Sequence, residues 1–198
     1  MSEIVKPRIG FAMTGSFCTF RPAFETAEAL VGAGYVLTPI MSFNAYDLST
    51  RFGTAEENRA RIESITGREI IHTIESAEPI GPKRLFDLIV ICPCTSNTMA
   101  KLANGINDTP VTMAVKSHLR NQRPIVIAVS TNDALSGAAK NIGLLENTKH
   151  YYFVPYRQDD YILKPFSMVA DFSKVQRTIE LALSEIQAQP MIENGIDR

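Results

Sequence analysis

Three short polar segments hold residues whose types and spacing suit the binding of an anion. Each follows an apolar run of the kind that forms a buried strand: Thr14-Gly15-Ser16, Ser42, and Thr95-Ser96-Asn97-Thr98. Hydroxyl and backbone N–H groups at the carboxyl ends of parallel strands, with helices starting behind them, can hold one phosphate monoester. Helix capping is the ordinary role of any one such segment. All three together favour a phosphate site that needs no lysine.

The first segment matches neither of the common nucleotide-binding loops. Gly10 and Gly15 have the spacing of a P-loop, but the lysine that reaches the terminal phosphates is absent. The dinucleotide fingerprint Gly-x-Gly-x-x-Gly is missing too, and the second strand ends at Ser42 and Asn44 without an acid for a ribose. The sequence therefore argues against nucleoside triphosphate hydrolysis and against a Rossmann dehydrogenase.

The cysteines and histidines do not form a metal-binding pattern. Cys92 and Cys94 point to the same side of a predicted strand, where we expect small structural residues. The three histidines are scattered without zinc-like spacing, so no metal is expected: His72, His118 and His150.

Cysteine count and charge indicate the compartment and the partners. Three cysteines cannot all pair within one chain, and residues 1–6 lack the apolar core of a signal peptide, so we expect reducing cytoplasm. The 198 residues include 20 Lys+Arg and 21 Asp+Glu, which argues against a dedicated nucleic-acid surface. The longest apolar run, residues 85–92, is interrupted by Asp87 and is too short to span a bilayer.

Apolar runs that alternate with helix-like stretches predict the architecture. The predicted strands are Ile9–Met13, Tyr35–Met41, Leu88–Cys92, Ile125–Val129 and Tyr151–Val154. Short apolar runs separated by helices are typical of parallel strands covered on both faces. We therefore predict an α/β, Rossmann-like, three-layer αβα fold with a mostly parallel sheet. Residues 1–198 are expected to form a single domain with a core at about 7–187 and a frayed tail at 188–198.

Helix signals separate these strands. Residues 21–33 have apolar side chains at helical spacing, and Thr54 with Glu57 fits a capping box for a helix that runs to Gly67. Two further helices are predicted from apolar stripes: Met99, Leu102, Ala103 and Ile106; and Phe172, Val175, Ile179, Leu183 and Ile186. Residues 42–53 and 155–168 read as irregular loops, which are either functional or flexible excursions.

The segment Cys92–Asp108 resembles the Pro-Ala-Ser-Ala-Asn-Thr motif, and the helix after it, of flavin-dependent cysteine decarboxylase-like proteins. These are homo-oligomeric, Rossmann-like FMN proteins that include the flavin prenyltransferases. The resemblance covers about residues 7–150 and implies that FMN phosphate and ribityl groups lie at Thr14-Gly15-Ser16 and Ser42. Residues 130–135 resemble a degenerate Pro-x-Met-Asn-x-x-Met segment, with Asn132 at the Asn position.

The same resemblance places Asn97 and Asn132 near the flavin ring, because an amide can both donate to and accept from its edge. Capping or turn formation is the alternative for each. Lys101 lies one helical turn after Asn97 and either directs its ammonium group at the pocket mouth or is a solvated helix residue. Family members place their flavin at an interface between protomers, so we expect a homo-oligomer, a trimer or a multiple of it, with Met99 and Met113 as candidate contacts.

Three stretches resemble a particular branch of this family: Glu78–Pro82, Cys92–His118 and Lys164–Asp171. This resemblance implies oxidation of a dihydropyridine dicarboxylate to its aromatic form during bacterial sporulation. It also implies a partner protein that resembles an NAD(P)-dependent dehydrogenase, and a location in the mother-cell cytoplasm.

A substrate with two carboxylates needs cationic side chains. The candidates are Arg120, Arg123, Arg157 and Lys164, for each of which surface solvation is the alternative. The cysteine decarboxylases that this chain resembles carry a catalytic His eight residues before the Asp that opens the central strand. Counted back from Asp87, that position holds Pro79, so decarboxylation of a peptidyl cysteine is disfavoured. No catalytic residue is assigned. The alternatives are a prenyltransferase or decarboxylase-like enzyme, and a non-catalytic partner protein that keeps the fold.

Overall fold

The computed structural model describes residues 6–194 and places seven strands in one sheet. The order is β2-β1-β3-β4-β7-β6, and β5 also pairs with β4. The strands are β1 (Arg8–Met13), β2 (Val36–Met41), β3 (Leu88–Cys94), β4 (Ile125–Thr131), β5 (Tyr151–Phe153), β6 (Tyr156–Asp160) and β7 (Lys164–Ala170). The first five pair in parallel, whereas β7 runs antiparallel to both β4 and β6. The predicted mostly parallel sheet is confirmed.

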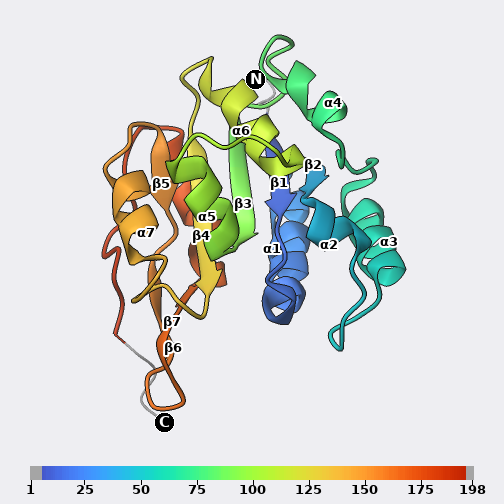
Figure 1. Cartoon of the computed structure of the whole chain (residues 1–198). Coiled ribbons are helices and arrows are strands. Elements are labelled where there is room, and N and C mark those ends of the chain that lie inside the picture. Colours follow the sequence, from blue (N-terminus) through green and yellow to red (C-terminus); the bar gives the residue numbers. More distant parts are fainter. Residues whose placement is uncertain (1–5, 195–198) are drawn as a thin grey trace.

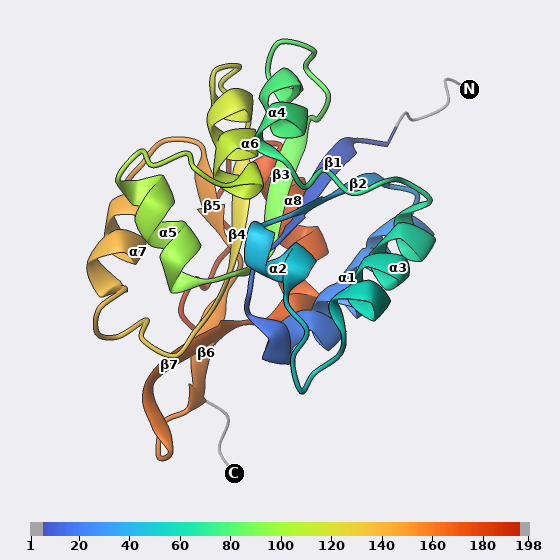
Figure 2. The ribbon, with the colours of Figure 1, turned by 45° about the vertical axis from the view of Figure 1, so that its right-hand side comes forward.

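Helices cover both faces of this sheet, which gives the predicted three-layer α/β fold (Figures 1 and 2). They are α1 (Phe20–Gly32), α2 (Phe43–Asp47), α3 (Ala55–Thr66), α4 (Ile74–Ala77), α5 (Ser96–Ala103), α6 (Pro110–Leu119), α7 (Ala139–Glu146) and α8 (Val175–Ala182). On one face α1 contacts α8, and on the other α5 contacts α6 and α7. No helix within residues 6–194 combines the length and apolar character that a membrane crossing requires.

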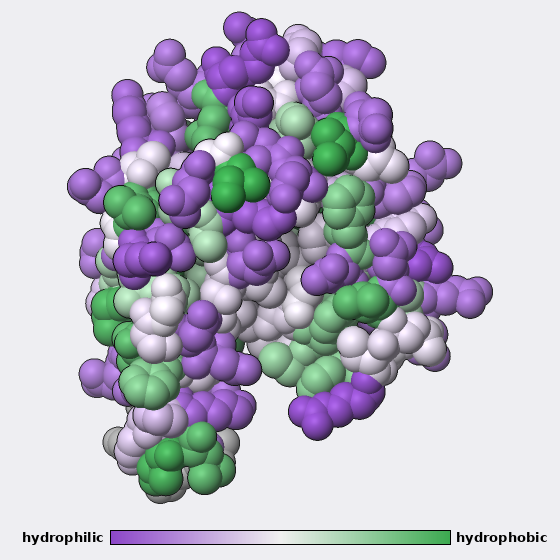
Figure 3. Space-filling view, viewed as in Figure 1, coloured by the Kyte–Doolittle hydropathy of each residue, from purple (hydrophilic) through white to green (hydrophobic). Residues whose placement is uncertain are grey.

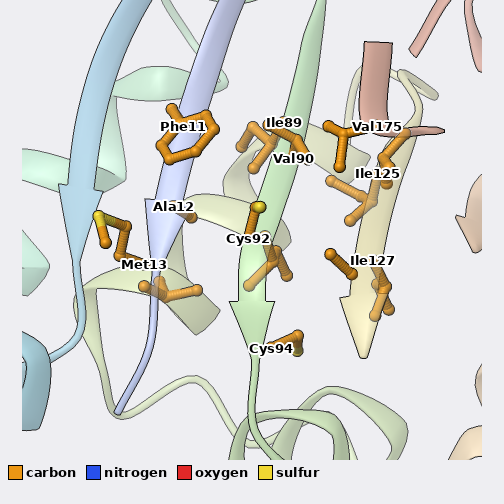
Figure 4. Close-up of a cluster of buried hydrophobic side chains, with 14 of the residues drawn as sticks. Phe11, Ala12, Met13, Ile89, Val90, Cys92, Cys94, Ile125, Ile127 and Val175 are labelled. Atoms are coloured by element: carbon orange, nitrogen blue, oxygen red, sulfur yellow. The ribbon is translucent and has the colours of Figure 1, made fainter. Parts of the chain in front are cut away.

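The core lies along the central strands. Every residue of β3 is buried, and so is β4 up to its last residue, because parallel strands with helices on both sides have no solvent face. In Figure 4 the side chains of Phe11, Ile89 and Ile125 lie beside one another on β1, β3 and β4, with Val175 of α8 nearby. This rigid centre fixes the loops that follow each strand.

The capping signals of α3 are confirmed. The Thr54 hydroxyl accepts from the N–H of Glu57 at 3.1 Å, and the Glu57 carboxylate accepts from the N–H of Thr54 at 2.9 Å. The helix ends at Gly67, whose φ of 63° lies in the left-handed region where glycine is favoured.

The segment 155–168, predicted to be an irregular loop, instead forms most of the β6–β7 hairpin. The sequence did not predict these strands because an edge hairpin that projects into solvent has no buried face, and its charged residues therefore show no apolar alternation. Figure 1 shows the hairpin projecting from the body of the sheet.

The predicted ends of two helices are wrong. Ile106 lies beyond α5, which ends at Ala103. Leu183 and Ile186 follow the end of α8 and are exposed, whereas Val175 and Ile179 of the same predicted stripe are buried.

The expected fraying after residue 187 is wrong for the described residues 188–194. Ala188 is buried, and the N–H of Tyr156 donates to the carbonyl of Met191 at 3.0 Å. The N–H of Glu193 in turn donates to the carbonyl of Tyr156 at 3.0 Å, which adds this segment to the edge of the hairpin. The rest of the predicted tail, 195–198, and residues 1–5 of the segment read as lacking a signal peptide, lie outside the described residues.

Candidate functional site

Two adjoining cavities open where the strands β1, β2, β3 and β4 end. The larger has a volume of about 720 Å³ and the smaller about 430 Å³, and Gly15, Thr95 and Ser96 line both. The smaller is also lined by Ser42, Phe43, Asn44, Asn97, Thr98, Lys101, Asp108 and Thr109. The larger continues past Ser16, Phe17, Cys18, Thr19, Thr50, Arg51, Phe52, Ser130, Thr131, Asn132, Asp159, Lys164, Ser167, Met168 and Val169. The three polar segments predicted from the sequence therefore meet at one edge of the sheet.

Thr14 joins the ends of two strands rather than facing the cavities. It is 1% exposed; its hydroxyl donates to the carbonyl of Pro93 at 2.8 Å and accepts from the N–H of Thr95 at 3.0 Å. Its own N–H donates to the same Pro93 carbonyl at 3.2 Å. Thr14 thus holds the loop after β1 against the start of α5.

The first turn of α5 forms the wall between the cavities. Thr95 caps the helix, since its hydroxyl accepts from the N–H of Thr98 at 3.4 Å. The hydroxyls of Thr95 and Thr98 also lie 3.2 Å apart, and Thr98 is buried. N–H groups in a first helical turn have no acceptor inside the helix and carry the positive end of its dipole. Ser96 and Asn97 therefore bring anion-binding groups to this wall.

Ser42 caps a helix and also lines the smaller cavity. Its hydroxyl accepts from the N–H of Ala45 at 3.4 Å and so caps α2, while its N–H donates to the carbonyl of Met13 at 3.1 Å. It also lines the smaller cavity, 8% exposed. Capping and ligand binding are thus compatible here.

A cluster of three hydroxyls lies on the floor of the larger cavity. The hydroxyl of Ser16 lies 2.8 Å from that of Ser130, and the hydroxyl of Thr19 lies 3.0 Å from that of Ser130. Thr19 also donates to the carbonyl of Ser16 at 2.9 Å. The sequence analysis did not name Thr19 or Ser130 as site residues. Ser130 could have been found by the rule that selected Ser16, because it too lies where a central strand ends.

Asn132 lies on the far wall of the larger cavity, next to the β6–β7 hairpin. Its side-chain oxygen accepts from the hydroxyl of Ser167 at 3.5 Å. The amides of Asn97 and Asn132 therefore face different cavities on either side of the shared wall.

Two predicted cations reach the cavities, each already beside a carboxylate. Lys101 lies 2.6 Å from Asp108 at the smaller cavity, and this hydrogen bond lowers the pKa of Asp108. Lys164 lies 2.7 Å from Asp159 at the larger cavity, and that carboxylate raises the pKa of Lys164.

The other predicted cations line neither cavity. Arg157 of β6 forms ion pairs with Glu193 at 3.2 Å and Asp171 at 3.7 Å. Arg123 pairs with Asp87 at 3.1 Å. Because Arg123 precedes β4, it lies at the opposite end of the sheet from the cavities, and Arg120 precedes it on the same connection.

Two of the cysteines are structural, as predicted. Cys92 and Cys94 are fully buried on β3, and burial raises the pKa of both thiols. Cys18 is exposed and lines the larger cavity. Within residues 6–194 no three His, Cys, Asp or Glu side chains gather as a metal site would require.

Gly15 keeps the shared wall open. A Cβ at this position would lie 3.5 Å from the nearest atom of Asn44 and 3.6 Å from the ring of Phe17, which are ordinary contacts. A larger side chain there would extend into space that both cavities share. With neutral hydroxyls and first-turn N–H groups around it, this wall fits a phosphate monoester without a dedicated lysine.

The chain belongs to the Flavoprotein family, whose profile matches residues 1–176. Over 195 residues it is 46% identical to the dipicolinate synthase B subunit of Bacillus subtilis (strain 168), and the alignment covers 98% of each protein. The crystal structure of the dipicolinate synthase B subunit from Bacillus halodurans C has a TM-score of 0.88 and is 39% identical, covering 96% of this chain and 97% of that one.

More distant relatives share the fold. The FMN-dependent cysteine decarboxylase SpaF has a TM-score of 0.69 at 23% identity, covering 91% of this chain and 97% of that one. The family expected from the Cys92–Asp108 segment is confirmed by the family profile, and the branch expected from Glu78–Pro82, Cys92–His118 and Lys164–Asp171 is confirmed by the 46% identity.

Proposed function

We propose that this chain is the FMN-binding B subunit of a dipicolinate synthase. In this proposal it contributes to the oxidation of dihydrodipicolinate to dipicolinate in the mother-cell cytoplasm of a sporulating bacterium. It acts beside the NAD(P)-dependent A subunit of dipicolinate synthase. The 46% identity to a dipicolinate synthase B subunit along almost the whole chain supports the assignment to dipicolinate synthase. The observation that carries the FMN assignment is the meeting of Gly15, Ser42 and Ser96 at two adjoining cavities.

The smaller cavity suits the phosphate. Ser42, Ser96 and Asn97 offer side-chain and backbone donors there, and the first turn of α5 adds the helix dipole, worth about 0.3 to 1 kcal/mol. Lys101 lines the same cavity, where it is paired with Asp108. The larger cavity then takes the ring, with Asn132 and the hydroxyls of Ser16 and Ser130 as polar partners.

FMN, when bound, supplies a two-electron redox centre. The chain's own residues bind and orient: the wall at Gly15, Thr95 and Ser96 fixes the depth of the ligand, and Thr14 keeps that wall rigid. Oxidation of the dihydropyridine removes two electrons and two protons and creates an aromatic ring, so alignment of substrate and acceptor is the main requirement.

A homo-oligomer, a trimer or a multiple of it, belongs to the same proposal. The tip of the β6–β7 hairpin supports it, because Ile162 and Leu163 are 73% and 77% exposed. Figure 3 shows apolar surface at the tip of this hairpin. Adjacent exposed apolar side chains of this kind would lose contact with water if a second protomer packed against them.

Titration of FMN into the purified chain, followed by flavin fluorescence, tests the cofactor assignment. The wild type is expected to bind FMN, and Gly15→Val to weaken binding at least about ten-fold because its side chain enters the shared wall. Gly143→Val is the matched control, since a Cβ there meets nothing within 4 Å. A wild-type protein that leaves FMN unbound would refute the cofactor assignment.

The second experiment measures dipicolinate formation by the two proteins together. The dehydrogenase-like A subunit is expected to form dipicolinate faster with this chain than without it, and Gly15→Val is expected to give a smaller gain. Equal rates with and without the chain would remove the synthase assignment even if FMN binds.

A further inference from the structure

The mouth of the larger cavity lies between two projecting segments. One is the loop Leu48–Gly53, which contributes Arg51 and Phe52; the other is the β6–β7 hairpin, which contributes Asp159 and Lys164. Figure 3 shows the surface recessed between the hairpin and the rest of the molecule. Residues more than a hundred positions apart thus lie on opposite sides of one opening.

Arg51 is a cation without a carboxylate partner among the described residues. Its guanidinium lies 4.8 Å from the ring centroid of Phe52, and no ion pair within residues 6–194 involves it. A guanidinium this close to an aromatic ring is attracted to it, while its N–H groups stay free to donate. Arg51 is therefore a cation of this cavity that is available to a carboxylate.

Lys164 faces the opening from the other side. Its side chain is 54% exposed and pairs with Asp159 at 2.7 Å. That carboxylate raises the pKa of Lys164, so the ammonium stays protonated. Among the described residues that line this cavity the only carboxylate is that of Asp159, against the two cations. The lining of the cavity therefore holds two cations and one carboxylate, and the neighbouring carboxylate of Asp160 also raises the pKa of Lys164.

We propose that Arg51 and Lys164 bind the two carboxylates of a planar pyridine or dihydropyridine dicarboxylate at this opening. This proposal rests on the proposed function and assigns the substrate-binding residues within it. Each cation takes one carboxylate, with Arg51 donating from its edge and Lys164 from its ammonium, while Phe17 and Phe52 supply apolar surface for the ring.

Arg51 replaces Arg157 in the substrate role expected from the sequence. Arg157 lines neither cavity, and its guanidinium pairs with Glu193 and Asp171 within the fold. The sequence analysis placed Arg51 in the irregular segment 42–53 but did not single it out, because only the folded chain brings it to the same cavity as Lys164.

Calorimetric titration with pyridine-2,6-dicarboxylate, in the presence and absence of FMN, tests the proposal. Arg51→Met and Lys164→Met are each expected to weaken binding by about ten-fold or more, the value of one charge-assisted pair. Pyridine-2-carboxylate, with one carboxylate fewer, is expected to bind the wild type about ten-fold more weakly, and Arg51→Met is expected to reduce this preference. Arg51→Lys should restore part of the loss.

The control variant is Lys140→Met, because Lys140 lies on α7 and lines neither cavity. It is expected to bind the dicarboxylate like the wild type. It should also bind FMN with wild-type affinity, and FMN titration of the wild type judges the cofactor assignment separately. Unchanged dicarboxylate affinity in Arg51→Met would overturn the proposed carboxylate binding by Arg51 and Lys164 while leaving the FMN assignment intact. A wild-type protein that does not bind FMN would instead refute the proposed function.

Discussion

The burial of His118 makes the free energy of unfolding depend on pH. This histidine lies on α6, fully buried, and neither of its ring nitrogens has a hydrogen-bond partner within the described residues. Burial lowers the pKa of His118 to about 4, and the nearby charge of Arg123 acts in the same direction. The backbone of Pro124 and the carboxylate of Asp87 raise it by less.

The size of the effect follows from proton linkage. An unfolded histidine has a pKa of about 6.5, so as the pH falls the unfolded chain takes up a proton before the folded chain does. The contribution of His118 to the free energy of unfolding is therefore fully present above about pH 6.5, and it is lost as the pH falls toward 4. Between pH 7 and pH 5 this one group is expected to remove about 2 kcal/mol of the free energy of unfolding.

Urea denaturation of the wild type and of His118→Leu at both pH values measures this quantity. Leucine cannot take up a proton, so the variant should lose about 2 kcal/mol less than the wild type between pH 7 and pH 5. The difference between the two proteins cancels the contributions of all other titrating groups. Equal losses in both proteins would refute the inference that His118 is buried as a neutral side chain.

Two further predictions concern packing and thiol access. Gly81→Ala is expected to lower the free energy of unfolding by about 1 to 3 kcal/mol, because a Cβ there would overlap the carbonyl oxygen of Ser117; an unchanged urea midpoint would contradict this contact. In the native protein a thiol reagent should modify Cys18 quickly, and Cys92 and Cys94 only after unfolding, since both are buried with a raised pKa; three fast-reacting thiols would show that β3 is accessible.

The central strands could be predicted from sequence because burial on both faces leaves a direct signal. The run Leu88–Cys92 is apolar at every position, and β3 starts at the predicted residue. The same holds for the capping box of Thr54 and Glu57, whose residues interact locally. Local patterns of this kind do not depend on the rest of the fold.

The edge of the sheet and the partners of the cations could not be predicted in this way. The strand β6 is charged and half-exposed, so its alternation is weak. Arg157 depends on Glu193, a contact between residues far apart in the sequence. The opening between Arg51 and Lys164 likewise exists only once the hairpin has folded against the sheet.

A crystal structure of this chain grown with FMN tests the central claim most directly. The account predicts the phosphate within hydrogen-bond distance of Ser96 and Asn97 at the start of α5, with the ring extending past Gly15 toward Asn132. A flavin bound elsewhere on the molecule, or no flavin at these cavities at saturating FMN, would contradict it.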